Sequence, residues 1–308
     1  MRRILAAMLP LTVWACALPQ GGPASTHDLF VLGVAQDGGV PHLGCERPCC
    51  EEARRGGRPL YPVSLGVHHV ETDQLMLFEA SPAIEAQVAL LHRWAGQRDR
   101  GRFPVDDVAL THAHIGHYLG LAHLGREVAG ARGVRVWVSQ RFADFLAAHG
   151  PWKQLVELDQ IRLMVIEPGV PFEPMPGLSV TAIPVPHRDE FSDTMAYKIR
   201  GPNRCVLFVP DIDRWERTGD LLDDLFRGVD VAYIDATFYD GRELPNRDMS
   251  EIPHPPMVDS MERLADRAAS VRFIHFNHTN PALRDAALRS DVERRGFRLA
   301  RRGERVRL

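Results

Sequence analysis

The stretch Thr111-His112-Ala113-His114-Ile115-Gly116-His117 gathers three imidazole side chains directly after the apolar run Val108–Leu110. In extended backbone, side chains two residues apart point to the same side, so the rings of His112 and His114 can converge on one cation. Imidazole is a good ligand for zinc, iron and copper. The sequence therefore predicts a metal site at this strand end, rather than a solvated loop or a lone structural histidine.

This stretch resembles the HxHxDH signature of the metallo-β-lactamase fold, and later residues follow in the order that this fold uses. His187, Asp211 and His275 each lie at the end of an apolar, strand-like run. The resemblance implies an α/β protein with a four-layer αββα sandwich and metals at one edge. It also implies two metals bridged by Asp211, the first held by His112, His114 and His187 and the second by His117 and His275.

The chain departs from the signature at Gly116, where the family has an aspartate. An anionic ligand of the second metal is therefore missing from the motif. Three neutral imidazoles still match an open, tetrahedral catalytic zinc site. We expect one firmly bound active-site zinc and a second site that is weaker or empty, with Asp189 and Asp213 as candidates to replace the lost carboxylate.

Four further motifs narrow the resemblance to one branch of this fold. They are Leu32–Pro41, Phe78–Pro82, Asp235–Phe238 and Ile274–Pro281. They resemble the branch that contains the pyrroloquinoline quinone biosynthesis protein B family and the phosphonate-pathway phosphodiesterases. The resemblance covers most of the chain after its first residues.

Cys45, Cys49 and Cys50 lie in a loop rich in Gly and Pro. The resemblance implies a structural zinc held by three such cysteines and by a histidine, for which His278 stands at the matching place. The spacing here is CxxxCC instead of the family's CxCxxC. A disulfide is the alternative in an oxidising compartment, although a bridge between the adjacent Cys49 and Cys50 would be strained. Cys205 opens an apolar run and is expected to be buried.

The expected function is a metal-dependent hydrolase with a small-molecule substrate. A metal on His112, His114 and His187 would lower the pKa of a bound water from 15.7 toward about 7. The resulting metal-bound hydroxide would attack an ester, lactone or phosphodiester, and we expect Asp211 and His117 to take part in catalysis, with Asp211 orienting the water. Other polar residues expected near the pocket, more often in structural roles, are His42, Asp37, Asp189, His254 and Asp240.

Two alternatives stay open. The same imidazole and carboxylate set binds iron, so the resemblance also admits an iron-dependent oxygenase of the quinone-cofactor biosynthesis type. The chain could instead be a non-catalytic metal-binding protein in which Gly116 marks a decaying site. Export argues against the first alternative, and the other retained ligand positions argue against the second.

The N-terminus is typical of an export signal. Arg2 and Arg3 precede the apolar run Ile4–Leu18, which at about 15 residues is too short to span a bilayer. We therefore expect residues 1–25 to be a signal peptide and residues 26–308 to form one domain that is exported. The protein is then periplasmic, or anchored to the membrane through lipid at Cys16, where Val13–Cys16 resembles a lipobox.

Composition excludes some functions, and apolar periodicity predicts the elements. The 37 Lys+Arg and 40 Asp+Glu residues give a net charge of −3, which does not favour nucleic-acid binding. The Arg-rich tail is expected to form an exposed edge hairpin turning near Gly303.

Expected strands are Leu29–Val34, Val63–Val70, Leu75–Phe78, Val108–Leu110, Val134–Val138, Leu178–Val185, Met195–Ile199, Val206–Val209, Val229–Ile234 and Val271–Phe276. Expected helices are Pro82–Trp94, His117–Val128, Arg141–His149, Met257–Ala269 and Pro281–Arg294.

Overall fold

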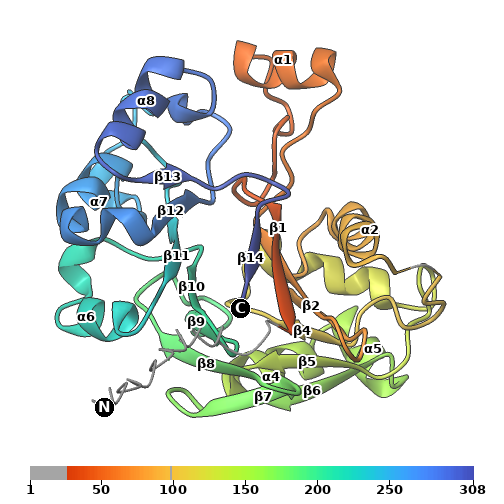
Figure 1. Cartoon of the computed structure of the whole chain (residues 1–308). Coiled ribbons are helices and arrows are strands. Elements are labelled where there is room, and N and C mark those ends of the chain that lie inside the picture. Colours follow the sequence, from red (N-terminus) through yellow and green to blue (C-terminus); the bar gives the residue numbers. More distant parts are fainter. Residues whose placement is uncertain (1–25, 98) are drawn as a thin grey trace, which may run out of the picture.

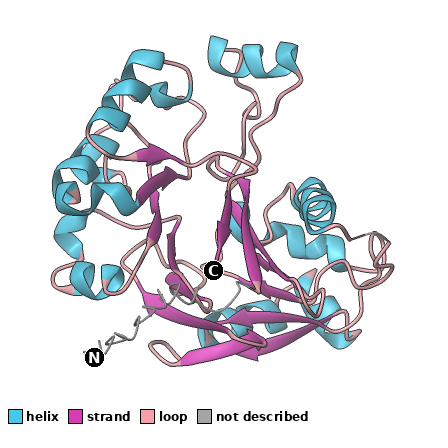
Figure 2. Ribbon diagram, viewed as in Figure 1, coloured by secondary structure: helices cyan, strands magenta, loops and turns pink. Residues whose placement is uncertain are grey.

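In the computed structural model, which describes residues 26–97 and 99–308, two seven-stranded sheets face each other and helices cover their outer faces. Figures 1 and 2 show these layers, with the strands of the two sheets meeting at the centre of the view. This is the αββα sandwich that the sequence predicts. The expected signal peptide, with Cys16, lies outside the described residues. Within the described ranges, no helix is long and apolar enough to cross a membrane.

The first sheet has the strand order β14-β1-β2-β3-β4-β5-β6. Its strands are β14 (Arg305–Arg307), β1 (His27–Gly33), β2 (Ser64–His69), β3 (Leu75–Phe78), β4 (Asp107–Ala109), β5 (Val134–Val138) and β6 (Ile161–Val165). The helical segments on this half are α2 (Ile84–Ala95), α3 (Ile115–Tyr118), η1 (Leu119–Leu124), α4 (Gln140–Ala148) and α5 (Trp152–Glu157).

The second sheet has the order β13-β12-β11-β10-β9-β8-β7. Its strands are β13 (Arg298–Leu299), β12 (Val271–Ile274), β11 (Val231–Asp235), β10 (Cys205–Val209), β9 (Met195–Arg200), β8 (Leu178–Pro184) and β7 (Pro171–Met175). The helical segments on this half are η2 (Trp215–Arg217), α6 (Leu221–Phe226), η3 (Met249–Glu251), α7 (Met257–Arg263), η4 (Ala265–Ser270), η5 (Pro281–Leu283) and α8 (Ala286–Arg294).

Strand β1 shows why the sheets are buried on both faces. Leu29 and Val31 belong to the core between the two sheets, whereas Phe30 and Leu32 belong to the core under α2. Successive side chains in a strand point to opposite faces. A strand with apolar residues at every position is therefore stable only when both of its faces are covered, as they are here.

Strand direction brings the candidate residues to one edge. Strands β10, β11 and β12 are parallel, so their carboxyl ends lie together, and β3 and β4 are parallel in the other sheet. Strand β8 runs in the direction of β10 because both pair antiparallel with β9. A bridge between Ala35 and Phe276 joins the end of β1 to the end of β12. The loops after these strands therefore meet at one place.

The structure of the Arg-rich tail differs from the edge hairpin that the sequence predicts. Strand β13 pairs parallel with β12, and β14 pairs antiparallel with β1. The two strands thus belong to different sheets and do not form a hairpin, although the chain does turn near Gly303 and each strand does lie at a sheet edge. An edge strand has unpaired backbone groups. Strands β12 and β1 offer such groups to β13 and β14, so the two strands of the tail pair with them instead of with each other.

Candidate metal centre

Asp211 is the centre of the candidate site. It follows β10 and is 2 % exposed. Its Oδ2 lies 3.0 Å from Nε2 of His112, 3.1 Å from Nε2 of His117 and 3.7 Å from Nε2 of His187. Its Oδ1 lies 3.1 Å from Nδ1 of His275. The predicted bridging carboxylate therefore does lie between the predicted histidine groups.

The other predicted histidine of the motif, His114, lies at the open side of the site. Its Nδ1 is 2.8 Å from Nε2 of His112, and its Nε2 is 2.9 Å from Oε2 of Glu190. A carboxylate on the far nitrogen of a metal-binding imidazole fixes the ring and raises its basicity. Glu190, from the loop before β9, is such a partner, which sequence reasoning did not identify.

Glu79 is a second residue that the sequence motif did not assign a role. It follows β3, is fully buried and has a left-handed backbone with φ 76°. Its Oε1 lies 3.2 Å from Nδ1 of His117 and accepts a 2.5 Å hydrogen bond from the Thr111 hydroxyl. That hydroxyl also lies 2.8 Å from Nδ1 of His112. Glu79 thus holds both rings with their Nε2 atoms toward Asp211, and backbone strain of this kind is common at functional sites.

A third carboxylate, Asp235, organises the opposite side. Its Oδ2 lies 2.7 Å from Nδ1 of His254, and its Oδ1 accepts a hydrogen bond from the Thr237 hydroxyl. The same hydroxyl lies 2.9 Å from Nδ1 of His275. Burial opposes protonation of His254, but Asp235 and, further away, Asp211 outweigh it and raise the His254 pKa to about 9. Asp235 thus favours the protonated form of His254.

The pKa values of two predicted ligands suit metal binding. Burial lowers the pKa of His112 well below its usual value, and burial also lowers the pKa of His187 to about 4. Both rings are thus neutral at pH 7 and can offer a lone pair to a metal. His117 differs, because Glu79 and Asp211 outweigh its burial and raise its pKa.

Several buried polar atoms of the site form no hydrogen bond among the described residues, although some of them lie at ion-pair distance from one another. They are Oδ1 of Asp37, both ring nitrogens of His117 and of His187, Oδ1 of Asp211 and Nε2 of His275. A buried polar atom without a partner costs free energy, so a cluster of such atoms needs an explanation. A bound cation satisfies nitrogen and carboxylate atoms that face one another, and the donor set therefore fits a metal.

The candidate ligands fall into overlapping groups whose ligand atoms lie within 4.8 Å of one another. One group contains His112, His114, His187 and Asp211; a second contains Asp37, His117 and His275; and a third contains Asp211, Asp235, His254 and His275. The first group matches the predicted first metal. The second contains two residues predicted for the second metal and adds Asp37, which was expected only to line the pocket.

The two carboxylates considered as replacements for the missing aspartate lie elsewhere. Asp189 pairs with Arg141 and has a side chain that is 70 % exposed, and Asp213 pairs with Arg217. Neither belongs to a candidate metal group among the described residues. Asp240 pairs with Arg242 and likewise belongs to no candidate metal group among the described residues.

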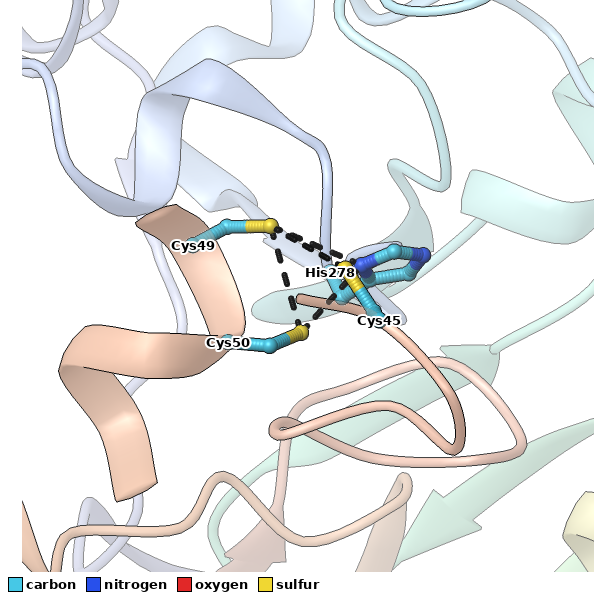
Figure 3. A group of neighbouring side chains, drawn as sticks. All are labelled: Cys45, Cys49, Cys50 and His278. Carbon is cyan, nitrogen blue, oxygen red and sulfur yellow. Dashed lines mark hydrogen bonds between the residues drawn. The ribbon is translucent and has the colours of Figure 1, made fainter. Parts of the chain in front are cut away.

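The cysteine cluster forms a separate candidate site. Cys49 and Cys50 lie on α1 (Pro48–Gly56), which Figure 1 shows standing off the sheets above β1, and His278 follows β12. Figure 3 shows the four side chains pointing toward one another. His42, expected near the pocket, instead stacks on His278 with ring centroids 4.5 Å apart. The described cysteines are all free thiols.

The distances in this cluster match a zinc tetrahedron. Cys49 Sγ lies 3.8 Å from Cys45 Sγ and 3.9 Å from Cys50 Sγ, while Nδ1 of His278 lies 3.7 Å and 3.4 Å from the sulfurs of Cys49 and Cys50. Tetrahedral zinc with bonds of about 2.3 Å to sulfur and about 2.0 Å to nitrogen separates two sulfurs by about 3.8 Å and a sulfur from a nitrogen by about 3.5 Å. The four residues therefore fit a structural zinc despite the CxxxCC spacing.

Comparisons with known proteins agree with this geometry. A family described as "Beta-lactamase superfamily domain" matches residues 75–276. The chain is 30 % identical to "Coenzyme PQQ synthesis protein B" of Methylobacterium nodulans, covering 91 % of this chain and 99 % of that protein. It is 27 % identical to the protein of that name from Rhizobium meliloti, covering 92 % and 99 %.

Solved structures extend the likeness to three dimensions. The crystal structure of Zn(2+)-bound PqqB from Methylobacterium extorquens matches with a TM-score of 0.76 and 25 % identity, covering 91 % of this chain and all of that one. A diphosphatase from the PhnP family matches with a TM-score of 0.67 at 19 % identity, covering 91 % and 96 %, which shows a shared fold. The chain therefore belongs to the beta-lactamase superfamily, in the branch of the coenzyme PQQ synthesis protein B relatives that its motifs predict.

Proposed function

We propose that this protein is a zinc-dependent hydrolase of a small ester, lactone or phosphodiester. The observation that carries the proposal is the setting of Asp211, whose two oxygens lie within 3.1 Å of ring nitrogens of His112, His117 and His275 inside a buried site. A ligand set rich in imidazole favours zinc or iron over calcium or magnesium, which prefer oxygen ligands. The Zn(2+)-bound relative supports zinc.

The first metal would be held by His112, His114 and His187, with Asp211 beside it. Zinc in such a site lowers the pKa of a water that it binds and polarises the oxygen of the bond to be attacked. Asp211 would orient that water, because its carboxylate lies between the histidine groups. Glu79 would keep the ring of His117 in place through the contact between Oε1 and Nδ1.

In this proposal His254 returns a proton to the leaving group. Asp235 accepts a hydrogen bond from Nδ1, which leaves Nε2 to donate to a substrate. Its ring centroid lies 5.2 Å from that of His187, so the donor is next to the proposed metal ligands. A positioned acid of this kind contributes about a hundredfold to ten-thousandfold in rate.

The direct test is hydrolysis by residues 26–308 after chelation and reloading. We expect zinc to restore cleavage of at least one member of a panel of p-nitrophenyl esters, lactones and bis(p-nitrophenyl) phosphate. The His187→Ala variant should stay inactive, while His123→Ala, at an exposed histidine outside the site, should match the unchanged protein. Zinc-loaded protein that cleaves no member of the panel would count against the proposal.

The second candidate is an iron-dependent oxygenation in quinone-cofactor synthesis. The name of the relatives, coenzyme PQQ synthesis protein B, favours it. The discriminating observation is the metal found in protein purified without added metal. Iron in the histidine site, together with oxygen consumption in the presence of an amino-acid-derived quinone precursor, would place this reaction first.

Export remains a proposal based on residues 1–25. We infer that the chain is secreted to the periplasm or anchored there through Cys16, since a positively charged start precedes a short apolar run. Fusion of the full chain to a reporter that is active only after export should give activity that is lost when residues 2–25 are deleted. A Cys16→Ser variant separates the soluble from the lipid-anchored form by membrane fractionation.

A further inference from the structure

The missing aspartate of the HxHxDH motif has a counterpart in space. A β-carbon on Gly116 would lie 2.0 Å from Oδ1 of Asp37 and 2.5 Å from the Cα of Asp37. The volume next to position 116 is therefore filled by an aspartate from the loop after β1. We propose that Asp37 replaces the motif's aspartate as an anionic ligand of the second metal, together with His117 and His275.

The polar atoms of these three residues converge on one point. Their ligand atoms lie within 4.8 Å of one another, and Oδ1 of Asp37 lies 3.4 Å from Nε2 of His117. Oδ1 of Asp37, Nε2 of His117 and Nε2 of His275 are all buried without a hydrogen-bond partner among the described residues. Nε2 of His117 also lies 3.1 Å from Oδ2 of Asp211. A carboxylate oxygen and two imidazole nitrogens without hydrogen-bond partners, next to the carboxylate of Asp211, form a suitable site for a divalent cation.

The position of Asp37 is fixed by the backbone. Ala35 forms a bridge with Phe276, and the backbone N–H of Gln36 donates a 2.8 Å hydrogen bond to the carbonyl of Phe276. Phe276 directly follows His275, whose own backbone is held in the left-handed region at φ 65°. The loop that carries Asp37 is thus tied to the strand end that carries His275. This anchoring keeps the carboxylate in place before any metal binds.

The packing of Asp37 explains why residue 116 is a glycine. Even an alanine there would bring a methyl group to 2.5 Å from the backbone of Asp37, which is closer than packed atoms tolerate. Glycine at position 116 and aspartate at position 37 are therefore coupled. On this proposal Gly116 makes room for Asp37 rather than marking a decaying site, and the histidine site would hold two metals, with Asp211 between them, where the sequence predicts one firmly bound metal. This inference rests on the metal site of the proposed function.

The test is a zinc titration of metal-free residues 26–308, followed by calorimetry and elemental analysis. The unchanged protein should bind two zinc ions in the histidine site besides the one at the cysteines, and Asp37→Asn should lose about one of the two. Gly116→Ala should lose the same ion, although it removes no ligand atom, because its methyl group displaces the loop of Asp37. The titration needs no substrate, so its outcome is independent of whether the protein proves to be a hydrolase.

Two variants serve as matched controls. Asp189→Asn removes a carboxylate that pairs with Arg141 at the surface, and Gly56→Ala adds a methyl group where no atom lies within 4 Å. Both should bind zinc as the unchanged protein does. The proposal is overturned if Asp37→Asn and Gly116→Ala bind as many zinc ions with the same affinity as the unchanged protein. It is also overturned if the unchanged protein binds only one zinc in the histidine site.

Discussion

At the scale of single residues, buried carboxylates that contact one ring nitrogen of a histidine determine which other nitrogen can bind a metal or carry a proton. Glu79 is fully buried, contacts Nδ1 of His117 and, through the hydroxyl of Thr111, reaches His112. Asp235 plays the same part for His254 and, through Thr237, for His275. Each pairing leaves a defined ring nitrogen for the centre of the site.

The Glu79→Gln variant tests this arrangement. The amide keeps the shape but loses the charge that orients the ring of His117, so we expect zinc affinity of the histidine site to fall about 10- to 100-fold. Competition with a chromophoric chelator measures the change. Glu85→Gln, at an exposed position on α2, should leave the affinity as it is. Equal zinc affinities in the two variants would show that Glu79 does not support the metal site.

The sequence predicted the histidines better than it predicted their partners. His112, His114 and His117 are recognisable because their spacing is local and they follow a strand. Asp37 lies far from them along the chain, and only the approach of two loops shows that it fills the place next to Gly116. Glu79 belongs to the motif Phe78–Pro82, but no neighbouring residue in the sequence indicates that its carboxylate points to His117.

At the scale of elements, the cysteine cluster joins α1 to the segment after β12. Cys45, Cys49 and Cys50 come from one loop and helix, and His278 lies more than two hundred residues later, with Cys50 Sγ 3.4 Å from its Nδ1. A metal that joins distant segments contributes to the stability of the folded chain, because the site does not exist in the unfolded chain. In the proposed site, a zinc ion would therefore help to hold Cys45 and α1 against the segment after β12.

The Cys49→Ala variant should lose about one zinc per chain and unfold at a lower temperature, because the tetrahedron loses a ligand. Elemental analysis and a thermal melt measure the two effects. Cys205→Ala is the control, since Cys205 is a free, buried cysteine of β10 outside the cluster. An unchanged zinc content in Cys49→Ala would mean that these cysteines do not hold zinc.

The start of β1 predicts a pH effect on stability. His27 is fully buried, and burial together with the nearby His69 lowers its pKa from 6.5 to about 4. In the unfolded chain His27 takes up a proton near pH 6.5, whereas in the folded chain it does so only near pH 4. Stability is therefore lost as the pH falls from 6.5 to 4, by up to about 3 kcal/mol.

Denaturant unfolding at several pH values between 7 and 4 measures this effect. Other histidines also titrate in this range, so the informative quantity is the difference between the unchanged protein and His27→Gln. The variant should show a weaker loss of stability on acidification, and His123→Gln, at an exposed position, should not. Parallel pH curves for His27→Gln and the unchanged protein would contradict the prediction.

Elements with a strong apolar pattern were predicted, and elements defined by tertiary pairing were not. Strands β3 and β5 match their predicted bounds because each is an apolar run with clear ends. Strand β6 was missed, since only one of its residues is buried and it lacks alternation. The hairpin at the tail was wrong because the partners of β13 and β14 lie in two different sheets.

At the scale of the whole molecule, the sandwich brings together residues that the chain separates widely. His112 follows β4 in one sheet, whereas Asp211 and His275 follow β10 and β12 in the other. The parallel strands end at the same edge, and the bridge between Ala35 and Phe276 closes that edge. The resemblance to the metallo-β-lactamase signature predicted this arrangement because the order of the motifs along the chain reflects the order of the strands.

The metal in the histidine site is tested by measuring the metal content of residues 26–308 beside a variant with both His112→Ala and His114→Ala. We expect the unchanged protein to contain zinc and the double variant to lose at least about one equivalent while keeping the zinc of the cysteine site. His123→Ala should retain the full content. An equal metal content in the double variant and the unchanged protein would mean that the histidine cluster holds no metal.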